Sequence, residues 1–211
     1  MRVTVFGASG RTGNHLVGQA LAAGHDVTAV VRATAHTLPA DSKLTVITAN
    51  VMEPGEIEPA VAGADAVLDA IGTRERGRTT VMADAATSIG QAMEATGARR
   101  LIVVSNSAAV AGPGDDPFTR YVVKPLILQR LLRHSLDDMA RAEEAVRHTR
   151  LDWTIVRAPQ LTDKPATGAY RTATDRNVTF GIRITRSDLA ACMIDLIDRP
   201  ETIRTHIHVA G

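Results

Sequence analysis

The chain has 211 residues, a net charge of +1 and a hydrophobic fraction of 45%. These values predict one globular domain and exclude a disordered chain, and the near-neutral charge gives no footprint for binding nucleic acid or a membrane surface. Its single cysteine, Cys192, excludes an internal disulfide and a cysteine metal cluster, and the seven histidines show no metal-ligand spacing. No segment is apolar for long enough to span a bilayer, and a strand pattern begins at once without a signal peptide, so we expect a cytoplasmic protein.

The first predicted strand, Val3 to Phe6, runs directly into three glycines and a helical segment. Gly7, Gly10 and Gly13 have the spacing G-x-x-G-x-x-G, a variant of the dinucleotide-binding fingerprint. In that fingerprint the first glycine ends the strand, the second lets the backbone approach a pyrophosphate, and the third lets the helix pack closely on the strand. We therefore predict phosphate binding at the helix N-terminus, with Arg11 as a second phosphate partner.

The end of the second predicted strand bears on the choice of cofactor. Thr12 is expected to cap the first helix and Gly24 to end it, and residues 27–31 form a near-continuous apolar run typical of a buried parallel strand. About 20 residues past the glycines an NAD enzyme usually carries Asp or Glu for the ribose hydroxyls, but this chain has Arg32. A guanidinium suits the 2′-phosphate of NADP, so NADP is favoured over NAD. The alternative is an ordinary solvated arginine.

Three more strands are predicted at 44–48, 66–71 and 101–104, with a helix from 80 to 95 that Gly97 ends. In doubly wound sheets the ligand lies beyond the carboxyl ends of the strands, so the residues after these strands are candidate contacts. They are Asn50 and Val51 near the adenine, and Ser105, Asn106 and Ser107 near the nicotinamide. Asp69 lies within its strand, and we interpret it as a structural acid hydrogen-bonded to a neighbour.

The segment after residue 110 contains a tyrosine and a lysine that invite comparison with the Tyr-x-x-x-Lys dehydrogenases. That chemistry needs the lysine one helical turn after the tyrosine. Here Tyr121 and Lys124 are one residue too close, and Pro125 disfavours helical geometry at Lys124. We therefore interpret Tyr121 as a pocket or surface residue.

The C-terminal part of the chain is expected to complete the sheet. Two helices are predicted to begin at capping boxes, at 135–138 and 185–188. Strands are predicted at 152–156 and 205–210, where His206 and His208 alternate as on a surface strand. Short strands at 168–174 and 179–184 around a polar turn form a small lobe. The strand at 152–156 delivers three residues to the ligand side of the sheet: Pro159, Gln160 and Leu161.

Four stretches together give the chain a family resemblance. They are residues 5–13, residues 72–74 with 79–82, residues 151–159 and residues 163–170. The chain resembles the atypical short-chain dehydrogenase/reductase group that contains biliverdin reductase B, an NADPH-dependent flavin reductase, and bacterial NADH-flavin-reductase-like proteins. The stretches occur in the right order over nearly the whole chain.

The resemblance implies a monomeric reductase that passes hydride from NADPH to a loosely held flavin, as substrate, or to a similar planar acceptor. It places Gly7, Ser9, Gly10, Arg11 and Thr12 on the pyrophosphate side, Arg32 on the 2′-phosphate, and Gly72, Thr73 and Arg74 along the ribose and nicotinamide. Ser107 matches a hydroxyl near the nicotinamide and the acceptor, with Pro159 and Gln160 on the other side. A second family arginine for the 2′-phosphate is replaced by His36, and aromatic residues of the acceptor pocket by residues 108–110.

These observations predict an α/β doubly wound parallel-sheet Rossmann fold with a small C-terminal substrate lobe. Residues 1–211 form a single domain, with 106–135 and 159–185 contributing the acceptor pocket. The expected activity is NADPH-dependent flavin reduction, with NADH as a possible cofactor and Ser107 at the reacting centre. Two alternatives share the glycine turn and Arg32: an NADP-binding redox sensor of the NmrA type without turnover, and a reductase of a specialised carbonyl or enone.

Overall fold

The computed structural model describes residues 1–32, 37–73, 77–109 and 133–211. Eight strands of these residues form one sheet, parallel except at one edge. In sheet order they are β3 (Leu44–Thr48), β2 (Asp26–Val31), β1 (Arg2–Phe6), β4 (Ala66–Asp69), β5 (Arg100–Asn106), β6 (Asp152–Ala158), β10 (Thr205–Ala210) and β8 (Arg171–Thr174). A separate two-stranded sheet pairs β7 (Gln160–Thr162) with β9 (Arg183–Thr185).

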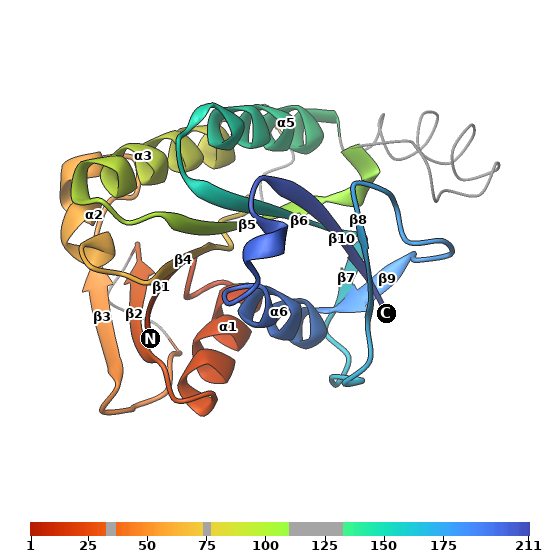
Figure 1. Ribbon diagram of the computed structural model, residues 1–211, viewed down its shortest axis with the longest axis horizontal. Helices are drawn as coiled ribbons and strands as arrows, with labels where there is room; N and C mark the ends of the chain where they lie inside the picture. The colour runs from red at the N-terminus through yellow and green to blue at the C-terminus, as the bar shows by residue number, and fades with distance from the viewer. Residues whose placement is uncertain (33–36, 74–76, 110–132) are drawn as a thin grey trace.

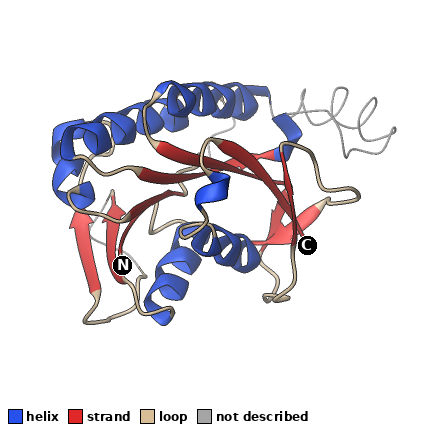
Figure 2. Cartoon of the chain, in the orientation of Figure 1, coloured by secondary structure: helices blue, strands red, loops and turns tan. Residues whose placement is uncertain are grey.

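Helices cover both faces of the main sheet, as Figures 1 and 2 show. One face carries α2 (Pro54–Val61), α3 (Val81–Thr96) and α5 (Arg133–His148), and the other carries α1 (Arg11–Ala22) and α6 (Arg186–Asp195). Along β1, Val5 packs into the core under α1 and α6, whereas Phe6 packs into the core under α2 and α3. Because both faces are covered, the central strands are apolar at nearly every position. The predicted doubly wound α/β fold with a small C-terminal sheet is confirmed.

The structure adds one helix to the prediction and moves the ends of several strands. The helix α2 was not predicted; it is short and starts at Pro54, in the first turn, where the missing N–H of proline costs no hydrogen bond. β4 ends at Asp69 and not at residue 71, so Asp69 stands at the carboxyl end of its strand. β5 continues to Asn106, which places Ser105 and Asn106 inside the strand and not beyond it.

The C-terminal strands pair differently from the expectation of a lobe built from 168–174 and 179–184. β8 pairs antiparallel with β10 at the edge of the main sheet, and β9 pairs parallel with β7. β10 therefore lies inside the main sheet, between β6 and β8. The reading of His206 and His208 as surface residues is wrong: His208 is 2% exposed, and the His206 ring packs edge-on to Trp153.

The helix caps also depart from the prediction. Thr185 caps α6 as expected: its hydroxyl accepts a hydrogen bond from the N–H of Asp188, and it donates to the carboxylate of Asp188 rather than leaving that acid to accept from the backbone. Thr12 does not cap α1, because the N-cap position is Gly10, which has no side chain to cap the helix. Asp138 does not cap its own helix either. Its carboxylate accepts hydrogen bonds from the first turn of α3.

Candidate nucleotide-binding site

The three glycines form a compact turn between β1 and α1. Gly7 has a φ of 68°, and its carbonyl oxygen accepts a hydrogen bond of 2.8 Å from the N–H of Gly10. A Cβ on Gly13 would lie 2.1 Å from the oxygen of Gly7, and a Cβ on Gly10 would lie 2.9 Å from the same oxygen. A Cβ on Gly7 would lie 2.8 Å from the carbonyl oxygen of Ala70, just after β4. Each glycine is therefore required by the packing of the turn itself.

The first turn of α1 begins at a glycine, so the N-cap residue itself supplies no side chain to its N–H groups. Gly10 is the N-cap, with extended backbone at φ −75° and ψ 165°. The N–H groups at the start of a helix have no partner within it, and the positive end of the helix dipole adds to their attraction for anions. Ser9 and Arg11 are exposed at this end and Thr12 is half-buried. The turn and the helix end together fit a pyrophosphate.

The predicted contact residues gather along one edge of the sheet. Arg32 follows β2, Asn50 and Val51 follow β3, and Gly72 and Thr73 follow β4. Because these strands are parallel and adjacent, their carboxyl ends meet at the same edge, with the topological switch point between β1 and β4. Arg32 is exposed, which leaves its guanidinium accessible to a ligand. Arg74, His36, Tyr121 and Lys124 lie outside the described residues.

The ends of β5 and β6 complete this edge. Asn106 accepts a hydrogen bond of 2.8 Å from the N–H of Ala108, which shapes the short turn that begins at Ser107. Ser107 is half-buried, and Pro159, Gln160 and Leu161 follow β6. Ser105 is different: its hydroxyl donates to Oε1 of Glu143 at 2.6 Å, inside the layer under α5. A contact between Ser105 and the nicotinamide stays a prediction, and the hydroxyl would have to leave Glu143 to make it.

Asp69 is buried at the switch point. Its Oδ1 accepts a hydrogen bond of 2.9 Å from the N–H of Ile71, as expected of a structural acid bonded to a neighbour. Burial raises the pKa of Asp69 to about 7, and the hydrogen bond from Ile71 only partly offsets this. The side chain is therefore partly protonated near neutral pH.

An exposed carboxylate links the glycine turn to the C-terminal part of the chain. Asp163, just after β7, accepts from Arg11 at 2.9 Å through one oxygen and from Arg186 at 2.5 Å through the other. Arg11 was predicted to lie beside the phosphates, whereas its pairing with this carboxylate was not predicted. Nearby, Nε of Arg183 donates to Oε1 of Gln160 at 3.1 Å, which joins β9 to the residue predicted to flank the nicotinamide.

Sequence reasoning also missed two buried carboxylates on α5, Asp138 and Glu143. The sequence does carry a signal for these two carboxylates. At 3.6 residues per turn they lie on the same face of the helix as the buried Leu136, Ala142 and Val146. An acid on the apolar face of a helix is unusual enough to call for a partner. Neither partner, however, can be read from the local sequence.

The fold and this edge define a nucleotide-binding protein of the doubly wound α/β class. Over residues 7–200 the chain matches the family described as NAD(P)H-binding. It is 24% identical to the uncharacterised protein YwnB of Bacillus subtilis over 209 residues, which cover 95% of this chain and 94% of that protein.

Three solved structures share the fold over the whole of this chain. The oxidoreductase ylbE from Lactococcus lactis has a TM-score of 0.85 and 21% identity, with 91% of its chain covered. A short-chain dehydrogenase/reductase from Veillonella parvula in complex with NADP has a TM-score of 0.83 and 21% identity, with 94% covered. A candidate NADH-flavin reductase from Streptococcus pneumoniae has a TM-score of 0.82 and 22% identity, with 99% covered.

The chain therefore belongs to the NAD(P)H-binding family. The resemblance noted in the sequence is confirmed at this level. In the part of the chain that the structure describes, no helix is long and apolar enough to cross a membrane.

Proposed function

We propose that this protein is an NADPH-dependent reductase that passes hydride to a flavin or a similar planar acceptor. The observation that carries the proposal is the shared edge of the sheet, where the glycine turn and the ends of β5 and β6 lie on either side of β4. A dinucleotide laid across the switch point, with its pyrophosphate on α1, directs its nicotinamide toward Ser107 and Gln160. Arg32 on the opposite side supports a preference for NADPH over NADH.

The acceptor is proposed from the family resemblance and the chemistry of this edge. The name of the Streptococcus pneumoniae protein also points to flavins, and its fold matches over the whole chain. NADPH supplies the hydride, which the flavin accepts at N5, and water supplies the accompanying proton. The residues then have to hold the two rings in contact, because proximity and orientation provide most of the rate. Ser107 orients the carboxamide in this scheme, and no strong acid is required.

The test is NADPH oxidation by the purified protein against flavins, quinones, tetrapyrroles and carbonyl compounds. We expect turnover with flavins and a higher kcat/KM with NADPH than with NADH. Tight NADPH binding without turnover on any acceptor would favour the NmrA-type sensor, and turnover only on a carbonyl or enone would replace the flavin as substrate. We also propose that the protein acts as a monomer, which light scattering at assay concentration can check.

Ser107→Ala tests the part played by the hydroxyl. We expect kcat to fall by about tenfold or less, because a misaligned carboxamide costs orientation and not a proton donor. The measurement is steady-state kinetics with NADPH and a flavin. A loss of several orders of magnitude would make Ser107 an essential acid and would contradict the stacking scheme.

A further inference from the structure

Two acidic side chains lie on the buried face of α5. Asp138 is 0% exposed and Glu143 is 5% exposed. Burying a carboxylate is costly unless it is paired and hydrogen-bonded, so both call for partners. Their partners lie on α3 for Asp138 and on β5 and β6 for Glu143, and all three elements lead to the edge of the sheet that carries the proposed site.

Asp138 caps a helix that is distant in sequence. Its two oxygens accept hydrogen bonds of 3.1 Å from the N–H groups of Met82 and Ala83, in the first turn of α3. The N-cap of α3, Thr80, makes no capping bond with its own side chain. Asp138 therefore holds the start of the helix that follows Gly72 and Thr73, the predicted ribose and nicotinamide contacts.

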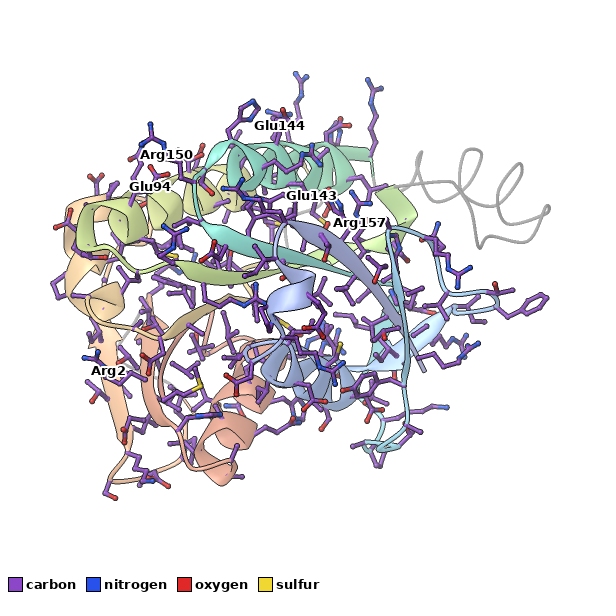
Figure 3. The ribbon with its side chains drawn as sticks, in the orientation of Figure 1. Arg2, Glu94, Glu143, Glu144, Arg150 and Arg157 are labelled. Carbon is purple, nitrogen blue, oxygen red and sulfur yellow. The ribbon has the colours of Figure 1, made fainter. Side chains whose placement is uncertain are left out.

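Glu143 joins two strands at the level where they leave the sheet. It accepts from Ser105 at 2.6 Å and, through both oxygens, from Arg157 at 3.0 and 2.5 Å. Ser105 and Arg157 are register partners on β5 and β6. Figure 3 shows Glu143 and Arg157 close together between α5 and the sheet, whereas Glu144 lies on the outer side of α5. Burial alone would raise the pKa of Glu143, but the hydrogen bonds from Arg157 and Ser105 outweigh it and lower the pKa, so the carboxylate is ionised.

We propose that Asp138 and Glu143 are positioning residues that set the nicotinamide half of the site. Ser105 lies two residues before Ser107, and Arg157 lies two residues before Pro159, so one carboxylate holds both strand ends. The adenine half comes from the ends of β2 and β3, on the other side of β1 from β5 and β6. This inference rests on the proposed function, because it assumes that a nicotinamide lies beside Ser107 and Gln160.

The test compares the two halves of the site in Glu143→Gln and Asp138→Asn. We expect kcat with NADPH and a flavin to fall by about 10- to 100-fold, because small misplacements of reacting groups cost this much. The affinity for 2′,5′-ADP, a probe of the adenine half alone, should change by less than about threefold, whereas the affinity for NADPH, which also uses the nicotinamide half, should fall by more than that. A residue that only stabilises the fold would leave kcat of the folded fraction unchanged.

A matched control lies at the opposite end of the same strands. Arg100 on β5 is also buried, and its guanidinium donates to Thr154, Thr202 and the carbonyl oxygen of Leu196. Arg100→Met should lower stability but leave kcat and 2′,5′-ADP binding of the folded protein unchanged. If Glu143→Gln fails to fold, Glu143→Asp keeps the charge but shortens its reach, and should give the same split between kcat and 2′,5′-ADP binding.

Two results would overturn the inference: unchanged kcat in the folded variants, or equal losses in kcat and in 2′,5′-ADP binding. Failure of the proposed function looks different, because the unmodified protein itself would then show no flavin-dependent NADPH oxidation. In that case there is no turnover to measure. The inference is then tested by the ratio of the affinity for NADPH to the affinity for 2′,5′-ADP in the variants and in the unmodified protein. A ratio that stays at the unmodified protein's value in the variants would count against positioning.

Discussion

Arg32 stands exposed directly after β2, where a ribose-binding acid is usual in NAD enzymes. If it holds the 2′-phosphate, Arg32→Ala should weaken NADPH and hardly change NADH, which lacks that group. A charge-assisted hydrogen bond contributes about 1.5–3 kcal/mol, so we expect a loss of roughly 10- to 150-fold for NADPH, in the lower half of that range because the site is exposed to solvent and salt. Dissociation constants for both cofactors check this. Equal losses would show that Arg32 is structural.

Asp69 should make the stability of the protein depend on pH. Its pKa is about 7 in the folded chain and about 4 when unfolded. Between these values the unfolded state releases its proton first, so the contribution of Asp69 to stability is greatest below about pH 4 and is lost as the pH rises to about 7. Asp69→Asn removes this loss and should therefore stabilise the protein relative to the unmodified chain more at about pH 8 than at about pH 5. Urea unfolding at the two pH values measures the difference, and a difference independent of pH would contradict a raised pKa.

At the scale of an element, the glycine turn has two roles: close packing between β1 and α1, and the predicted binding of the pyrophosphate. Substitutions of different glycines can separate these roles. A Cβ at Gly13 would overlap the Gly7 oxygen at 2.1 Å, whereas a Cβ at Gly10 would approach it at 2.9 Å. We therefore expect Gly13→Ala to lower the melting temperature more than Gly10→Ala. Gly10→Val should abolish NADPH binding because the turn must shift and because a side chain would intrude where the backbone is expected to approach the pyrophosphate. Thermal unfolding beside calorimetric NADPH titration tests both points. Unchanged NADPH affinity in folded Gly10→Val would remove the phosphate site from this turn.

At the scale of the whole molecule, Asp163 joins the first helix to the C-terminal part of the chain. The side chain of Arg11 is 61% exposed and that of Arg186 is 10% exposed, although both pair with this carboxylate. Arg11→Ala should change the free energy of unfolding by less than about 1 kcal/mol, as exposed ion pairs do. Asp163→Ala leaves a buried guanidinium without its carboxylate and should cost about 1.5–3 kcal/mol. Urea unfolding of the two variants compares them, and equal small effects would mean that the bridge to Arg186 contributes no stability.

Much of this protein followed from local sequence. The spacing of Gly7, Gly10 and Gly13 after an apolar strand predicted the turn, because only glycine tolerates such close backbone contacts. Apolar runs and helical periods predicted the parallel sheet and, from its carboxyl edge, the set of candidate contacts. Such signals survive in a single sequence because they depend on residues that are neighbours along the chain.

The tertiary structure decided what depends on residues far apart in sequence. Asp138 caps α3 across 56 positions, and the position of Glu143 beneath the ends of β5 and β6 appears only when α5 packs on the sheet. His208 is buried on β10, which pairs with β8. The alternation of His206 and His208 along the sequence had instead indicated a strand at the surface. A buried charge selects its partner by distance and desolvation, which act between residues that the fold brings together. The sequence alone therefore determined the class of fold and the edge where the nucleotide is expected, and the packing of α5 decided which carboxylates hold that edge in place.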